Sequence, residues 1–138
     1  MSLNYTNTFI SVAEDSKVDV GTVPKRKEGK STIAEVQFHL LVEQPYQFTQ
    51  EDVLFQSSSA MRENPELSAE ERKELRAEFF SKSQACLRAS PMGKTYGWGI
   101  HFNAEGFAAA YGVETREYQE YAADKSLYQT RAMRSKRA

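Results

Sequence analysis

The chain has 138 residues, of which 40% are hydrophobic and 27% are charged, values typical of a globular protein and not of a disordered or fibrous one. Its formal net charge of −1 excludes a strong overall field toward nucleic acid or an anionic membrane. The one cysteine, Cys86, excludes an intrachain disulfide and a cysteine-cluster metal site.

The N-terminal stretch MSLNYTNTF lacks the basic and apolar regions of a secretory leader, and no apolar run is long enough to cross a bilayer. We therefore expect a cytoplasmic protein. The length predicts a single domain over residues 1–138, with a basic C-terminal tail from about residue 125.

A strand and a helix are predicted in the first part of the chain. Residues 5–13, YTNTFISVA, are rich in β-branched and aromatic side chains and predict the strand. A loop with two glycines, a proline and four cations follows over residues 20–31. Ser31 is the expected cap of a helix over residues 32–43, although alternate residues there are also apolar, as in a strand. The cap, the length and Pro45 favour the helix.

Two more helices are predicted in the middle of the chain. Thr49 caps the first, over residues 48–63, which carries acids in its first turn. Its serine run at residues 57–59 is a weak helix former that we expect to fray or shorten it. In the second helix, over residues 67–82, Ser68 and Glu71 form a capping box, and the inward side chains are Leu75, Phe79 and Phe80.

The last part of the chain combines strands with a helix. Residues 84–90, QACLRAS, are a short strand candidate, and residues 97–113 form a hairpin. Thr115 caps a helix over residues 113–124 that buries Tyr118, Tyr121 and Ala122, and the tail beyond is expected to continue as helix. The fold class is therefore α+β, with a small antiparallel sheet of about three to five strands covered by about four helices.

The hairpin turn has the sequence NAEG, in which the glycine suits a left-handed backbone conformation. This turn pairs Asn103 with Phe107, so Trp98, Ile100 and Phe102 share a face of the sheet with residues 108, 110 and 112. A two-residue turn is the alternative, and it would shift the register by one residue.

Gly97 and Gly99 flank His101 on the opposite face of this strand. One interpretation is that the glycines allow close packing or a bulge. The other is a recess beside His101 that binds a small anionic ligand, with candidate ligand-binding residues Arg88, Lys94, Tyr96, His101 and Tyr111.

Two residues are candidates for catalysis, Cys86 as a nucleophile and His101 as its base. The alternative for Cys86 is a small buried apolar residue, and for His101 a surface histidine. His39, the second histidine, has no partner at metal-ligand spacing, so no metal and no cofactor are predicted. Basic segments at residues 25–30 and 131–137 permit weak nucleic-acid binding, which the acidic remainder of the chain disfavours.

Six short segments, spread along the chain, carry a resemblance to a family of small bacterial proteins of unknown function: NYTNTFI, VGTVP, TQEDVLF, CLRASP, YGWGIHF and MRSKR. The resemblance extends over nearly the whole chain. The resemblance implies no activity. The sequence thus predicts a small binding or interaction module with a recess near His101. A small enzyme acting on an anionic molecule through Cys86 and His101 is the alternative, and a weak nucleic-acid binder is the second.

Overall fold

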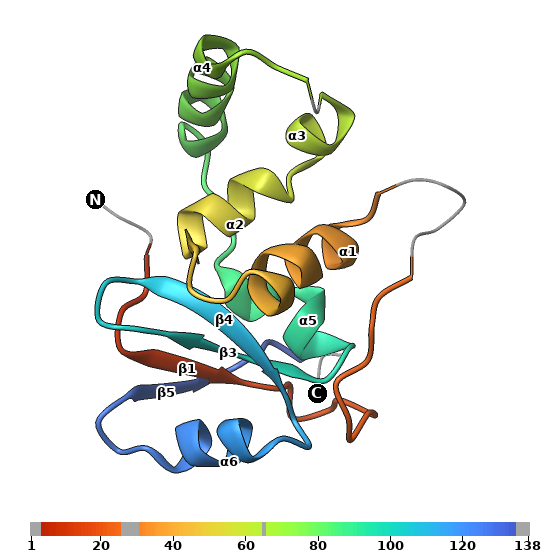
Figure 1. Cartoon of the computed structure of the whole chain (residues 1–138), viewed down its shortest axis with the longest axis vertical. Coiled ribbons are helices and arrows are strands. Elements are labelled where there is room, and N and C mark those ends of the chain that lie inside the picture. Colours follow the sequence, from red (N-terminus) through yellow and green to blue (C-terminus); the bar gives the residue numbers. More distant parts are fainter. Residues whose placement is uncertain (1–3, 26–30, 65, 135–138) are drawn as a thin grey trace.

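A five-stranded mixed sheet forms the centre of the computed structural model, which describes residues 4–25, 31–64 and 66–134 (Figure 1). The strand order is β2-β4-β3-β1-β5. The strands are β1 (Thr8–Ser11), β2 (Phe48–Thr49), β3 (Trp98–Phe102), β4 (Phe107–Gly112) and β5 (Tyr128–Arg131). The fold class is α+β, as predicted, and the sheet is mixed because β5 runs parallel to β1.

The predicted hairpin is formed by β3 and β4, and its turn has the predicted chemistry. Asn103 Oδ1 accepts from the backbone N–H groups of Glu105 and Phe107, and Gly106 takes a left-handed conformation with φ of 89°. Phe102 pairs with Ala108 and His101 with Ala109, which is the favoured register. Consecutive residues of β3 therefore face opposite sides of the sheet as predicted.

Helices cover both faces of the sheet (Figure 1). Helix α6 (Arg116–Ala123) lies on one face, and α1 (Ile33–Phe38), its π-helical continuation η1 (His39–Glu43) and α5 (Pro91–Lys94) lie on the other, with the 3₁₀ turn η2 (Leu87–Ala89). Helices α2 (Gln50–Gln56), α3 (Ser59–Glu63) and α4 (Ala69–Phe80) extend this layer away from the sheet. The main core lies between the sheet and this layer, where Ile10, Leu41, Val53, Leu87, Ile100 and Phe102 are at most 1% exposed.

Side-chain caps set most helix boundaries. Thr32 caps α1 in place of the predicted Ser31, because its hydroxyl accepts from the N–H of Glu35. Thr49 caps α2 as predicted. The serine run divides the helix predicted over residues 48–63, since α2 ends at Gln56 and the Ser58 hydroxyl caps the new helix α3. Ser68 and Glu71 form the predicted capping box of α4.

The strand predicted over residues 84–90 is wrong. Backbone hydrogen bonds from Ala89 to Cys86 and from Ser90 to Leu87 close two turns of 3₁₀ type there. The N–H of Leu87 donates to the buried Gln50 side chain, not to a neighbouring strand. Pro91 then starts α5, for which its fixed φ is suited.

The tail after residue 124 does not continue as a helix, contrary to the prediction. Asp124 Oδ1 accepts from the N–H and hydroxyl of Ser126 and turns the chain. The chain then returns as β5 beside β1. Helix α6 buries Tyr118 as expected, whereas Ala122 is exposed.

Candidate functional site

The recess predicted beside His101 is filled by the chain itself. A Cβ atom at Gly99 would lie 2.6 Å from the rings of both Phe9 and Tyr118. A Cβ atom at Gly97 would lie 2.5 Å from the carbonyl oxygen of Val20. Other parts of the chain therefore occupy the space that the missing side chains leave, and the glycines serve close packing.

His101 belongs to a cluster of hydrogen-bonded aromatic side chains under α6. The Tyr46 hydroxyl lies 2.9 Å from His101 Nδ1, 2.9 Å from the Tyr111 hydroxyl and 3.2 Å from the Tyr121 hydroxyl. The Tyr121 ring stacks on the imidazole with a centroid distance of 3.9 Å. Tyr46 itself has a positive φ of 59°, a backbone conformation that is uncommon for residues other than glycine. We call these four residues the Tyr46 cluster.

Burial disfavours the charged forms of three residues in the Tyr46 cluster. It lowers the pKa of His101, which is only 8% exposed, against the opposing effect of the Asp124 carboxylate. Burial also raises the pKa of Tyr46, as do its hydrogen bonds with Tyr111 and Tyr121. Burial raises the pKa of Tyr111 as well. The cluster is therefore a neutral network that holds α6 on the sheet.

The remaining predicted site residues lie away from His101. The Tyr5 hydroxyl donates to Cys86 Sγ at 3.4 Å, and the Tyr5 ring packs on Phe102. Burial and the Cys86 contact raise the pKa of Tyr5 to about 12. Because Phe102 and His101 are adjacent in β3, they face opposite sides of the sheet, so Cys86 and His101 are not a nucleophile and base pair.

The predicted cationic rim is also not formed around His101. Arg88 belongs to η2, where its Nε donates to the carbonyl oxygen of Arg131 at 2.6 Å. Lys94 is the last residue of α5, in the helix layer of the other face, and Tyr96 follows shortly after it. Of the five predicted ligand-binding residues, the structure brings together only His101 and Tyr111.

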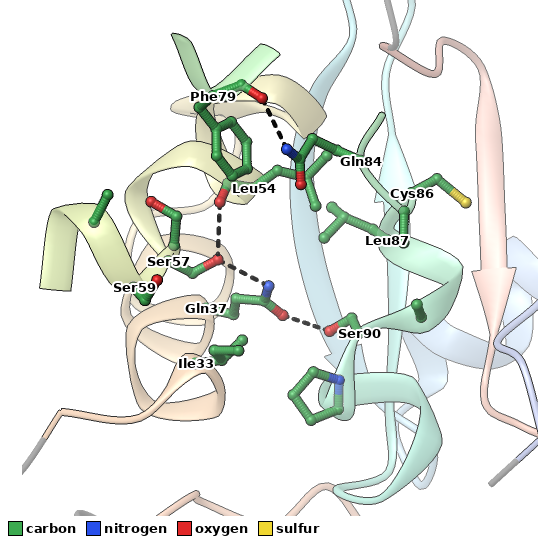
Figure 2. A pocket seen from close by; sticks show the side chains of 15 residues that line it. Ile33, Gln37, Leu54, Ser57, Ser59, Phe79, Gln84, Cys86, Leu87 and Ser90 are labelled. Atoms are coloured by element: carbon green, nitrogen blue, oxygen red, sulfur yellow. Dashed lines mark hydrogen bonds between the residues drawn. The ribbon is translucent and has the colours of Figure 1, made fainter. Parts of the chain in front are cut away.

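A cavity of about 320 Å³ lies within the helix layer, between α1, α2 and α3 on one side and η2 and α5 on the other (Figure 2). The end of α4 adds Phe79 to its wall. Apolar side chains dominate the lining, among them Ile33, Leu54, Ala60, Phe79, Leu87 and Pro91. None of the described residues that line it has an ionisable side chain except Cys86.

A buried polar network lies at the floor of this cavity, with Gln37 at its centre. Gln37 is 3% exposed. Its Nε2 donates to Ser57 Oγ at 3.1 Å, and its Oε1 accepts from Ser90 Oγ at 2.5 Å (Figure 2). The Ser57 hydroxyl donates in turn to the carbonyl oxygen of Val53. These bonds join α1, α2 and the start of α5, and they hold the amide rigidly at the cavity floor.

Cys86 contributes to the cavity wall, but its sulfur points away from the cavity in Figure 2. This direction agrees with the hydrogen bond that the thiol receives from Tyr5. The thiol is therefore directed away from the space that the cavity offers.

Sequence patterns did not indicate Gln37 and Ser90 as site residues, and they indicated Ser57 only as a weak helix former. One signal was present: Gln37 lies on the inward side of its helix, in register with Ala34 and Leu41, where an apolar residue is expected. A polar residue at such a position needs buried hydrogen-bond partners. The partners came from segments distant in sequence, so the pattern could not identify them.

The segments behind the nucleic-acid alternative lie partly outside the described residues. Residues 26–30 and 135–137 are outside them. Within the described part of the tail, an Arg134 guanidinium nitrogen lies 3.9 Å from a Glu14 carboxylate oxygen. Over residues 4–25, 31–64 and 66–134, the helices are all too short or too polar to span a membrane.

The chain was compared with known protein families, curated proteins and solved structures. The model of a family of unknown function, DUF6157, matches residues 1–138. No curated protein and no solved structure matches. The resemblance drawn from the sequence segments is thereby confirmed, and the chain belongs to the DUF6157 family of unknown function.

Proposed function

We propose that the protein is a small binding module of the bacterial cytoplasm, and that its cavity takes up one small, uncharged and largely apolar molecule. A single observation carries the proposal: an apolar cavity of about 320 Å³ has a fixed, buried amide at its floor. Its volume is near the lower end of the range of about 300–1,000 Å³ found for ligand pockets.

The charge of the ligand follows from the lining. Burying an unpaired carboxylate or ammonium group is very costly, and no lysine, arginine, aspartate or glutamate among the described residues lines the cavity. A neutral ligand therefore takes the place of the anionic ligand that the sequence suggested, since the anionic ligand depended on Arg88 and Lys94 beside His101. The direction of the Cys86 sulfur supports binding over covalent chemistry.

The wall near Phe79 supports entry of a ligand from solution. Helix α4 has no buried residue. It is held to α2 by the contact of the Phe79 and Phe55 rings and by the 3.0 Å ion pair between Arg76 and Asp52. A wall with so little buried surface can open at low cost in free energy.

Filling the cavity tests the proposal. Ala60 lines the cavity from α3, whereas Ala77 lies exposed on α4 and does not line it. We expect toluene to bind the wild-type protein in calorimetry or NMR titrations. Ala60→Phe should weaken this binding by about tenfold or more, because the added ring occupies the volume, and Ala77→Phe should leave it unchanged. Equal binding by both variants would place the ligand elsewhere.

A further inference from the structure

We infer that the ligand carries an uncharged amide group, as in a carboxamide or lactam, which the side chains of Gln37 and Gln84 recognise from different parts of the cavity. The inference rests on the proposed function. It adds the chemical class of the ligand and names the two residues that select it.

The orientation of the Gln37 amide is fixed by backbone groups that can act in only one way. The Val53 carbonyl can only accept, so the Ser57 hydroxyl must donate to it at 2.7 Å and must accept from Gln37. The Met92 N–H can only donate, and it donates to Ser90 Oγ at 3.0 Å. The Ser90 proton is then available for Gln37, so the nitrogen faces Ser57 and the oxygen faces Ser90.

This arrangement determines what the floor offers to a ligand. Both serine hydroxyl protons are committed, and one of the two Nε2 hydrogens of Gln37 is used by Ser57. The second Nε2 hydrogen is the remaining side-chain donor of the network. It calls for an acceptor on the ligand, and a neutral carbonyl oxygen provides one without burying a charge.

Gln84 offers the complementary group from another part of the wall. Its Nε2 donates to the carbonyl oxygen of Phe79, in the last turn of α4, at 2.8 Å. Its Oε1 has no hydrogen-bond partner among the described residues, and Figure 2 shows this oxygen directed toward Leu54 and Leu87 of the cavity wall. An acceptor in this position calls for a donor on the ligand.

An amide provides both groups, since a carbonyl acceptor and an N–H donor are attached to the same carbon atom, and it carries no charge. A carboxylate lacks the donor and adds a charge, whereas an amine adds a charge of the opposite sign. An alcohol has both functions on one oxygen, which has to serve two separate side chains. The apolar walls accommodate the remainder of the ligand.

Four probes of similar size separate these classes: benzamide, benzyl alcohol, benzoate and toluene. Each is titrated into the wild type, Gln37→Leu, Gln84→Leu and the matched control Gln56→Leu, whose residue lies on α2 and does not line the cavity. We expect the wild type to bind benzamide about tenfold more tightly than toluene, the effect of one or two net hydrogen bonds. In Gln37→Leu and Gln84→Leu, benzamide and toluene should bind with more nearly equal affinity. In Gln56→Leu, the preference for benzamide over toluene should persist.

The two proposals fail in different ways. Wild-type protein that binds toluene as tightly as benzamide, or that prefers benzyl alcohol, overturns the amide inference and leaves the cavity as a site for a neutral molecule. A preference for benzoate overturns the amide inference and also the uncharged ligand of the proposed function. Wild-type protein that binds none of the probes overturns both. Gln37→Leu could fail to fold because Gln37 is buried, whereas Gln84 is only half-buried. In that case Gln84→Leu alone tests the inference, and an unchanged preference of this variant for benzamide over toluene overturns it.

Discussion

At the scale of single residues, Gly99 illustrates how a strand glycine can serve packing. Its missing side chain leaves room for the rings of Phe9 and Tyr118, which contact each other with a centroid distance of 5.1 Å and bring α6 onto the sheet. The Tyr118 hydroxyl also accepts from the N–H of Val12 in the segment after β1. Gly99 is thus required by the docking of α6.

We expect Gly99→Ala to lower the free energy of unfolding by about 1–3 kcal/mol, because the added methyl overpacks a site with no free volume. Denaturant unfolding measures the change. Ala104→Gly, in the exposed turn of the hairpin, is the control for altering a small residue and should have little effect. Unchanged stability in Gly99→Ala would mean that the space above the strand is open.

The Tyr46 hydroxyl is the hydrogen-bond partner shared by His101, Tyr111 and Tyr121. Tyr46→Phe removes it and leaves the buried His101 and the half-buried Tyr111 and Tyr121 to find other partners. We expect a loss of about 1–3 kcal/mol in the free energy of unfolding. Tyr128→Phe is the matched control, since Tyr128 is 64% exposed, and it should be neutral. Equal effects of the two changes would contradict a structural role for the cluster.

The lowered pKa of His101 predicts a pH dependence of stability. The unfolded chain binds a proton at His101 near the ordinary pKa of about 6.5, whereas the folded chain does so only at lower pH. Folding stability is therefore full above about pH 6.5 and falls as the pH drops from there through the folded pKa.

Denaturant unfolding between about pH 7.5 and 5 measures this fall. His101→Gln should flatten the profile, whereas His39→Gln, which changes an exposed histidine, should retain it. A wild-type protein whose stability rises as the pH falls through this range would contradict the burial of a neutral His101.

At the scale of elements, local chemistry made the hairpin and the caps predictable. The NAEG turn and the capping residues Thr49, Ser68 and Thr115 act on backbone groups within a few residues, so the sequence contains both partners. Residues 84–90 and β5 were misjudged because their conformations depend on distant partners. These partners are Gln50 for the former and β1 for the latter.

Helix α4 depends on its cap more than on packing, since none of its residues is buried. Ser68→Ala removes the hydroxyl that accepts from the Glu71 N–H at 3.1 Å. We expect the free energy of local opening of α4 to fall by about 1 kcal/mol, with little effect on global unfolding. Hydrogen exchange of the α4 amides measures this opening, and Ser83→Ala, beyond the helix, is the control. A cooperative loss of global stability would show that α4 is integral to the core.

At the scale of the whole molecule, the sheet separates two side-chain clusters with different roles. The Tyr46 cluster fills one face under α6, and the cavity with Gln37 lies in the helix layer of the other (Figures 1 and 2). Strand alternation predicted which hairpin residues share each face. It could not predict the cavity, because Ser57, Ser90 and Gln37 come from three segments that only the tertiary fold brings together.

The most direct test is a map of where a neutral ligand binds. Assigned ¹H–¹⁵N and methyl spectra of the wild-type protein are recorded with increasing toluene. We predict saturable shifts at Ile33, Leu54 and Leu87, which line the cavity, and none beyond background at His101 and Tyr111 on the other face. Shifts centred on His101, or no saturable shift at the cavity residues, would contradict the assignment of this cavity as the binding site.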